Sequence, residues 1–383
     1  MKRCRLSFVL GTALVALALL GGCRKQAGSI EVGALFAVTG GAANLGLPEE
    51  RTARMFVDEL NAKGGLLGRT VALTVMDTQG SSEKAVSFAR QLIEERHVLA
   101  IIGPSTSGET MAIKALCEEN KTILLSCAAA EAIVNPVASH VFKTPQDDKN
   151  AAIWIYRTMK EMGIKRIGVV AANTGFGTLG KQQLEKYAPE NGIDIAIAEV
   201  YDSQATDLTG VLTKVNAAGV EAVVNWSVDP AQSIVAKNMR QLGMKQPLFQ
   251  SHGFGNIAYV TAAGEAAEGI IFPAGRLLVA ALLPDTDPQK SLLLKYKSDY
   301  EKLYGEQVST FGGHAYDALL VLSEAVKKAR SVEPEAVRSA IESLSVVGTA
   351  GAFAFSPTDH NGLTLDAFTM QTVRNGAFVP LKP

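Results

Sequence analysis

The sequence has almost no excess charge and few cysteines. Its 37 lysines and arginines nearly balance 38 acidic residues, which gives a net charge of −1. Neither a nucleic acid nor an acidic surface is therefore indicated as a partner. Only four cysteines occur in 383 residues, and no cysteine or histidine spacing is typical of a metal site. We expect no metal and no cofactor.

Two of the cysteines, Cys117 and Cys127, are expected to be free and mostly buried thiols. Cys117 falls late in a predicted helix, and Cys127 ends the predicted strand that follows it. Helix and strand run antiparallel in a β–α–β unit, so the two residues lie on the order of 15 Å apart. A disulfide requires Cα atoms within about 7 Å.

Apolar runs long enough to span a membrane are missing after residue 23. Before it, three basic residues precede an apolar stretch at 6–20, the pattern of an export signal. Leu20-Gly21-Gly22-Cys23 resembles a bacterial lipobox, in which cleavage leaves a lipidated cysteine. We expect a signal peptide at 1–22, a tether at 23–29 and a periplasmic lipoprotein held to a membrane through Cys23. A plain secretory signal and a retained membrane helix are the alternatives.

Strand and helix signals alternate regularly along the rest of the chain. Apolar runs alternate with amphipathic segments from residue 33 to residue 127, and the pattern restarts at residue 150 and continues to residue 250. Such alternation predicts parallel sheets that are covered by helices on both faces. Two runs predict an α/β fold with two lobes, each a mainly parallel sheet flanked by helices.

The last third of the sequence adds to these lobes. A strand at 269–273 is followed by helices at 288–304, 313–329 and 334–344. Segments 353–355 and 365–373 then alternate like a hairpin around a good turn sequence.

Several crossings between the lobes are expected, near 143–148, 273–277 and 349–352. We assign 30–145 plus 275–350 to the first lobe, and 146–274 plus 351–383 to the second. Several crossings form a hinge. Ligands of open α/β sheets bind at the carboxyl ends of the strands, so the predicted site is the cleft between the lobes.

The stretch 100–111 has the features of an anion site. An apolar strand is broken by Gly103-Pro104, and a polar loop of Ser105, Thr106 and Ser107 leads into a helix. Backbone N–H groups and hydroxyls at a helix N-terminus bind anions. Alternatively, Ser107 only caps the helix.

Five short motifs stand in order along the chain: Phe36-x-x-Thr39-Gly40, Asn61-Ala62-Lys63-Gly64-Gly65, Gly103-Pro104-Ser105-Thr106-Ser107, Phe176-Gly177 and Ala267-Glu268-Gly269. No single motif is specific, but the ordered set resembles the bacterial leucine/isoleucine/valine-binding protein family, the ligand-capturing subunits of ABC importers. The resemblance covers nearly the whole chain after residue 23. It implies the type I periplasmic-binding fold, a small-molecule ligand, an inner-membrane ABC permease as partner, and a monomer.

The resemblance also implies where a ligand carboxylate binds. The loop of Ser105, Thr106 and Ser107 would hold it, with the hydroxyl and N–H of Ser107 in contact. The backbone of Ala128 would help, and Phe176 would cover the ligand from the second lobe.

The part of the family site that holds an amino acid's ammonium group differs here. The family hydroxyl falls on Ala130, which has none, and the family acid falls near His252-Gly253, where no carboxylate stands. A buried ammonium without an acceptor is costly. Glu131 or Asp229 are the possible substitutes. Besides branched-chain amino acids, the family default, we therefore expect aromatic or aliphatic carboxylates and amides as ligands.

Two further residues are candidates for the cleft. Trp226 ends a strand, where it either stacks on a ligand or packs in the core. His252 follows the next strand and is either a donor in the cleft or a structural loop residue.

Three classes of function remain open: a transport binding protein, a ligand-sensing module of similar fold, and an exported enzyme. We favour the first and expect no catalysis. Residues 175–180 imitate the dinucleotide fingerprint G-x-G-x-x-G. Extra residues separate them from the strand, however, and Phe176 is bulky where a pyrophosphate would pass.

Overall fold

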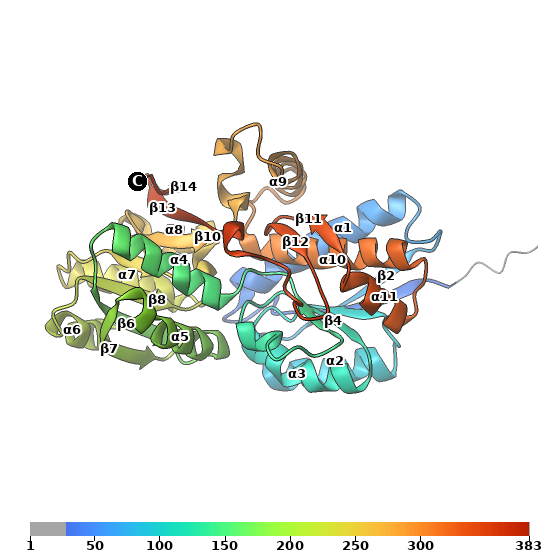
Figure 1. Ribbon diagram of the computed structural model, residues 1–383, viewed down its shortest axis with the longest axis horizontal. Coiled ribbons are helices and arrows are strands. Elements are labelled where there is room, and N and C mark those ends of the chain that lie inside the picture. Colours follow the sequence, from blue (N-terminus) through green and yellow to red (C-terminus); the bar gives the residue numbers. More distant parts are fainter. Residues whose placement is uncertain (1–27, 383) are drawn as a thin grey trace, which may run out of the picture.

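The structure is a computed structural model that describes residues 28–382. The predicted signal peptide, the lipobox and Cys23 lie outside the described residues. Between residues 28 and 382, no helix is long and apolar enough to cross a membrane. Two lobes lie side by side, with the chain passing repeatedly between them (Figure 1).

The first lobe is built on a parallel sheet with the strand order β2-β1-β3-β4-β5. The strands are β1 (Ile30–Phe36), β2 (Val71–Asp77), β3 (Ala100–Ile102), β4 (Ile123–Ser126) and β5 (Val141–Lys143). Helices α1 (Ala43–Ala62), α2 (Ser82–Glu94) and α3 (Ser107–Glu119) connect them. Ile101 and Ile102 of β3 belong to different apolar clusters, because successive side chains of a strand point to opposite faces.

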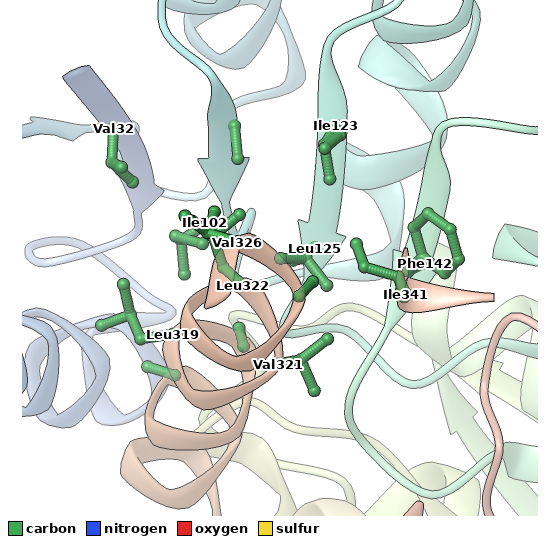
Figure 2. Packing of buried hydrophobic residues seen from close by; sticks show 14 of the residues in the cluster. Val32, Ile102, Ile123, Leu125, Phe142, Leu319, Val321, Leu322, Val326 and Ile341 are labelled. Atoms are coloured by element: carbon green, nitrogen blue, oxygen red, sulfur yellow. The ribbon is translucent and has the colours of Figure 1, made fainter. Parts of the chain in front are cut away.

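One face of this sheet is covered by helices from far along the sequence. Leu319, Leu322 and Val326 of α10 (Thr310–Ala329) pack in the same cluster as Ile102 and Leu125 (Figure 2). Helix α11 (Pro334–Ile341) extends the cover. Ala53 and Val57 of α1 cover part of the same face, so this side of the sheet is fully closed only when residues synthesised late are in place.

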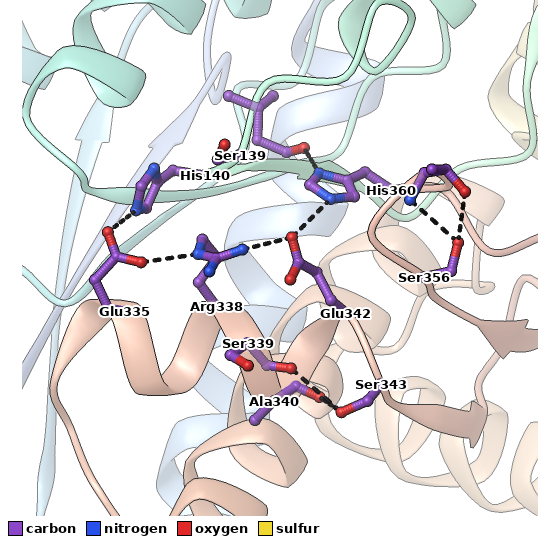
Figure 3. A network of polar contacts seen from close by, with 12 residues as sticks. Ser139, His140, Glu335, Arg338, Ser339, Ala340, Glu342, Ser343, Ser356 and His360 are labelled. Carbon is purple, nitrogen blue, oxygen red and sulfur yellow. Dashed lines mark hydrogen bonds and ion pairs between the residues drawn. The ribbon is translucent and has the colours of Figure 1, made fainter.

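A polar network ties α11 to the edge of the sheet. Arg338 contacts both Glu335 (2.9 Å) and Glu342 (2.5 Å). The two carboxylates lie 3.3 Å from His140 and 3.4 Å from His360, respectively (Figure 3). His360 Nδ1 also lies 2.9 Å from the carbonyl oxygen of Val141 in β5.

The second lobe contains a mixed sheet with the strand order β14-β13-β10-β9-β8-β6-β7. Its parallel part is formed by β6 (Arg166–Ala172), β7 (Asp194–Tyr201), β8 (Ala222–Trp226), β9 (Leu248–Gln250) and β10 (Ile271–Ala274). Strands β13 (Thr369–Arg374) and β14 (Ala377–Pro380) add to it in antiparallel fashion. The helices of this lobe are α4 (Asp148–Glu161), α5 (Gly175–Tyr187), α6 (Thr209–Ala217), α7 (Ala231–Gln241) and α8 (Ile257–Ala263).

The hairpin predicted for 353–355 and 365–373 is wrong. Strand β12 (Ala352–Ala354) instead pairs in antiparallel fashion with β11 (Ser345–Val347), which precedes it in the chain. Strand β13 pairs with β10 and β14. The physical reason is packing, because Phe355 lies edge-on against Phe142 of the first sheet. The polar turn sequence after Phe355 holds that segment on the first lobe.

The chain crosses between the sheets after β5, after β10 and between β12 and β13. The third crossing lies later than the predicted 349–352, because Phe353, Phe355 and Leu363 are buried in the core of the first lobe. The boundary that assigned 351–383 to the second lobe is therefore wrong for this segment.

The crossings are tied to one another. Gln146 Nε2, on the first crossing, donates to the carbonyl oxygens of Ala350 (2.8 Å) and Ala367 (3.3 Å) near the third. Gln371 Nε2 donates to the carbonyl oxygen of Gly275 on the second (2.9 Å). Helix α9 (Lys290–Tyr304) stands beside this region (Figure 1). These bonds make the crossings one connected hinge.

The thiols of Cys117 and Cys127 are free and buried, as predicted. Burial raises the pKa of Cys117 to about 12 and that of Cys127 well above its ordinary value. Both are therefore kept in the unreactive thiol form.

Candidate functional site

The loop before α3 forms one wall of the cleft and is held by a capping box. Thr106 Oγ1 accepts from the backbone N–H of Glu109 (3.3 Å), and the Glu109 carboxylate accepts from the N–H of Thr106 (3.2 Å). Thr106 therefore caps the helix, and the capping role considered for Ser107 is wrong. Ser107 is the first helical residue, and its hydroxyl oxygen lies 3.4 Å from the N–H of Ala130.

Ser105 is bonded within the first lobe. Its hydroxyl oxygen accepts from the N–H of Ala37 (3.0 Å), and the hydroxyl donates to the carboxyl group of Glu49. Glu49 is completely buried, and burial raises its pKa well above the ordinary value. The hydroxyl proton of Ser105 is thus already donated to Glu49. The hydroxyl of Ser107 is therefore the better placed of the two to bind a ligand.

A cavity lies between the lobes, with about 340 Å³ of atom-free space, part of which is open to solvent. Six of the eight predicted ligand-binding residues line it together: Ser105, Thr106, Ser107, Ala128, Phe176 and His252. Ala130 and Trp226 do not line it. The structure thus brings most of the predicted site into one place, and their contact with a ligand stays a prediction.

Trp226 lies behind the cavity wall, so its predicted place on the cleft surface is wrong. Its side chain is 0% exposed. Its ring centroid lies 5.8 Å from that of Phe176 and 5.7 Å from that of His252, both of which line the cavity. Gly180 of α5 leaves room for the indole, since a Cβ there would lie 1.9 Å from Trp226 Nε1. Trp226 therefore belongs to the core of the second lobe and supports the cavity wall from behind.

The glycines that imitate a dinucleotide fingerprint serve the packing of α5. A Cβ on Gly177 would lie 2.0 Å from the carbonyl oxygen of Ala172 at the end of β6. Together with Gly180 against Trp226, this places the helix close to its sheet. The motif is explained by close approach of backbone and ring.

Sequence reasoning missed several lining residues. Pro145, Val228, Phe311 and His314 also line the cavity. His314 and Phe311 belong to α10, about which the strand-end rule says nothing. The only local signal was Gly312-Gly313 beside them, where the first two turns of the helix pack closely on Tyr296 and Thr349.

Two buried histidines give the cavity neutral polar groups. Burial, with the nearby charge of Lys143, lowers the pKa of His252 and of His314 to about 3. Both ring nitrogens of His252 and Nδ1 of His314 have no hydrogen-bond partner within residues 28–382. Both imidazoles are therefore uncharged at neutral pH.

Lys143 lies directly behind the cavity wall. Its Nζ donates to the carbonyl oxygens of Ala129 (3.0 Å) and Pro145 (3.1 Å), two lining residues. The side chain is fully buried, which lowers its pKa. The nearby carboxylates of Asp147, Asp148 and Glu131 act the other way and favour the charged ammonium form. That positive charge opposes a second cation in the cavity and favours an anion.

A second cavity, with about 810 Å³ of atom-free space that is partly open to solvent, shares Thr106, Phe176 and Val228 with the first. Asp229 lines it, and both of its carboxylate oxygens are buried without a partner in the described part of the chain. Burial raises the pKa of Asp229 to about 7. Glu131 lines neither cavity and accepts from Gln183 (3.0 Å). Of the two possible substitutes for the missing acid, only Asp229 is placed in the cleft.

The lobes touch across the cleft. A Cβ on Gly175 would lie 2.9 Å from the backbone of Gly108, so the starts of α3 and α5 meet closely. Asn256 Nδ2 donates to the carbonyl oxygen of Asn44 (2.9 Å), and Gln183 reaches Glu131 from the other lobe. The two lobes are therefore in direct contact at several places along the cleft.

Two parallel-sheet lobes, a hinge of several crossings and a cavity between the carboxyl ends of the strands define the class of two-lobe solute-binding proteins. The chain belongs to the periplasmic binding protein family, whose model matches residues 29–377.

Its relatives share this architecture. A Leu/Ile/Val-binding protein, BraC3, of Rhizobium johnstonii is 24% identical, over 91% of this chain and 93% of the relative. The crystal structure of an extracellular ligand-binding receptor from Rhodopseudomonas palustris HaA2 is 27% identical, with a TM-score of 0.87 over 92% of this chain and all of that one. A solute-binding protein of an ABC transporter from Rhodopseudomonas palustris BisB5, solved with 3,4-dihydroxybenzoic acid, shares the fold at 15% identity, with a TM-score of 0.79 over 92% of this chain and 96% of that one.

Proposed function

We propose that the protein is the extracytoplasmic solute-binding subunit of an ABC importer, and that it captures a small carboxylate in the cleft. The observation that carries this proposal is the inner cavity. It lies between the lobes, the start of α3 forms part of its wall, and it is otherwise mainly apolar.

The start of α3 supports an anionic end for the ligand. The first N–H groups of a helix have no partner within the helix, and the helix dipole favours negative charge there. Ser107 brings its N–H and hydroxyl to this place, and Ala128 lies beside it on the wall. Lys143 behind the wall adds a positive potential. The same wall disfavours an ammonium group at this depth.

The apolar lining indicates what the ligand carries besides its carboxylate. Leu45, Phe176, Val228 and Phe311 contribute aliphatic and aromatic surface. A branched-chain or other hydrophobic amino acid, or a related organic acid, fits such a lining. The relatives' names point to both, since BraC3 is called a Leu/Ile/Val-binding protein and the BisB5 protein was solved with an aromatic acid. For an amino acid, Asp229 is the acceptor that the ammonium group would need.

The working cycle follows from the hinge. The ligand binds to the first lobe through Ser107 and Ala128, and closure brings Phe176 over it. The closed form, held to the membrane through a lipid on Cys23, is presented as a monomer to the permease in the inner membrane. The same closure would serve a ligand-sensing module, and uptake of the ligand by cells with and without the gene separates the two functions.

A thermal-shift screen tests the proposal. The full exported chain is heated with branched-chain amino acids, their desamino analogues, aromatic acids, and the amides of the same acids. At least one carboxylate is expected to raise the melting temperature, because binding adds RT ln(1 + [L]/Kd) to the free energy of unfolding. Its amide is expected to raise the melting temperature less. Absence of any shift with all carboxylates, or larger shifts with the amides, contradicts a carboxylate site.

A further inference from the structure

Two imidazoles reach the inner cavity from different lobes. His252 begins the short helix η3 (His252–Phe254) after β9 of the second lobe, and His314 lies in α10, which packs on the first sheet. Both side chains are more than nine-tenths buried, and both line the cavity. The two rings therefore border the same cavity, one from each lobe.

These rings carry unpaired polar atoms. Both nitrogens of His252, and Nδ1 of His314, are buried with no partner among residues 28–382. Buried polar groups in proteins are nearly always hydrogen-bonded, and leaving them unpaired costs stability. Away from the cavity, His360 Nδ1 has the carbonyl oxygen of Val141 as its partner. His360 Nε2 and both nitrogens of His140 make no hydrogen bond either, but each lies 3.3–3.4 Å from a carboxylate. No such carboxylate contact is found for His252 or His314 among residues 28–382. The unpaired atoms at the cavity point to a partner that is not part of the chain.

The surroundings fix what kind of partner this is. His252 is enclosed by aromatic rings, with centroids 5.3 Å away for Phe176 and 5.6 Å for Phe368. Burial and the charge of Lys143 keep both imidazoles neutral. A neutral imidazole has one N–H donor and one acceptor nitrogen. The pair thus offers donors and acceptors without charge, inside an apolar wall.

We propose that His252 and His314 hydrogen-bond a hydroxyl group of the ligand, so that the ligand is a hydroxylated aromatic carboxylic acid. The proposal rests on the proposed function, which places the carboxylate at the start of α3. A hydroxyl both donates and accepts, and so complements a neutral imidazole. An ammonium group only donates, and here it would also lie near the buried charge of Lys143. Phe176 and Phe311 on the wall suit an aromatic ring.

Matched pairs of acids test the inference with the wild-type chain. Binding is measured by calorimetry for benzoate against 3- and 4-hydroxybenzoate, and for phenylacetate against 4-hydroxyphenylacetate. In at least one pair the hydroxylated acid is expected to bind tenfold or more tightly, because a site built to bond a hydroxyl discriminates strongly against its absence. Equal affinity within every pair overturns the histidine proposal and leaves the carboxylate site standing. Absence of binding by every acid here and in the thermal-shift screen refutes the proposed function itself.

Substitutions assign the preference to the rings. His314→Leu and His252→Leu are each expected to abolish the tenfold preference, read as the ratio of the Kd values of the two acids within the same variant. His314→Gln, which keeps a donor and an acceptor, is expected to retain part of it. His140→Gln is the control, because His140 lies in the network of α11 away from the cavity. A preference that persists in both leucine variants overturns the proposal.

A measurement on the unaltered protein covers the case in which a variant does not fold. Nitrogen-15 spectra of the imidazoles report which ring nitrogen carries the proton and whether it is hydrogen-bonded. The hydroxylated acid is expected to shift the ring-nitrogen resonances of His252 and His314 much more than the parent acid does. Identical spectra with both acids contradict the proposal.

Discussion

The loop before α3 and the wall of the second lobe, which face each other across the cleft, treat their polar groups in opposite ways. On the first lobe, Ser105, Thr106 and Glu109 are bonded to backbone groups or to one another. On the second lobe, His252 and Asp229 have no partner among the described residues. The loop before α3 is thus largely bonded within the chain, whereas the second wall leaves polar atoms for a ligand, as does Nδ1 of His314, which reaches the cavity from α10 of the first lobe. We infer that the start of α3 holds the part common to all ligands, and that the second wall together with His314 decides among them.

The largest expected effect concerns what supports the second wall. Trp226→Ala removes a fully buried ring from between the sheet and α5, and about 3–5 kcal/mol of folding free energy is lost with such a ring. Urea unfolding of the ligand-free protein measures the loss. Unchanged stability with much weaker ligand binding would instead put Trp226 on the cavity surface.

The next effect separates binding from capping on the first wall. Ser107→Ala is expected to weaken carboxylate binding by about 1.5–3 kcal/mol, because a hydrogen bond to a charged group is lost. Its matched control is Thr106→Ala, which removes the cap and costs about 1 kcal/mol of stability. Calorimetry and melting curves of both variants measure these changes. If Ser107→Ala lowers the melting temperature and leaves the Kd unchanged, the anion site is refuted.

The histidines predict a pH effect on folding. Because His314 has a folded-state pKa near 3, below its unfolded value, it contributes stability above about pH 6.5 that is lost as the pH falls. Relative to His314→Gln, the wild type is expected to lose about 2 kcal/mol between pH 6.5 and pH 5.

The wild type has to be compared with His314→Gln because other buried titratable groups change the stability with pH in the opposite direction. The pKa values of Asp148, Asp229 and Asp317 are raised by burial to about 7. Their contribution is present at low pH and is lost as the pH rises through 7. These groups are common to both proteins and cancel in the difference. A difference that does not vary with pH would mean that His314 is not buried as a neutral ring.

The smallest expected effect is on the first wall itself. Cys127 lines the cavity but is a buried thiol with a raised pKa, so a thiol reagent is expected to leave it unmodified in the native protein. After denaturation without reductant, both Cys127 and Cys117 are expected to react. Mass spectrometry counts the labels, and rapid native labelling of Cys127 would show that the first wall opens.

The parts of the fold and site that were predictable are those with local signals. Apolar runs separated by helices identified the two sheets, and the polar loop of Ser105, Thr106 and Ser107 correctly indicated the part of the cavity wall that the first lobe contributes. The strand-end rule located Trp226 at the correct edge of the sheet but gave no information on which side of the wall the ring lies. Gly180 was the missed clue, since only a glycine there admits the indole.

What could not be predicted depends on contacts between distant segments. His314 reaches the cavity from a helix of the first lobe, and the Gly312-Gly313 pair beside it signals close packing of that helix rather than a ligand site. The hairpin was wrong because Phe353 and Phe355 find their places on the first core, so packing overrode a favourable turn sequence. Unpaired ring atoms also have no signature in a sequence, because pairing is a property of the folded surroundings.

The late cover of the first sheet sets an order for biogenesis. All five strands of that sheet have been made when β5 ends at Lys143, yet Leu319 and Leu322 lie in a helix that begins at Thr310. A nascent chain that ends in the second lobe therefore displays Ile102 and Leu125 without their cover (Figure 2). The lobe whose strands are translated first is completed last, which reverses the usual N-terminal-first sequence of domain folding. Until α10 emerges, that bare face is available to a chaperone.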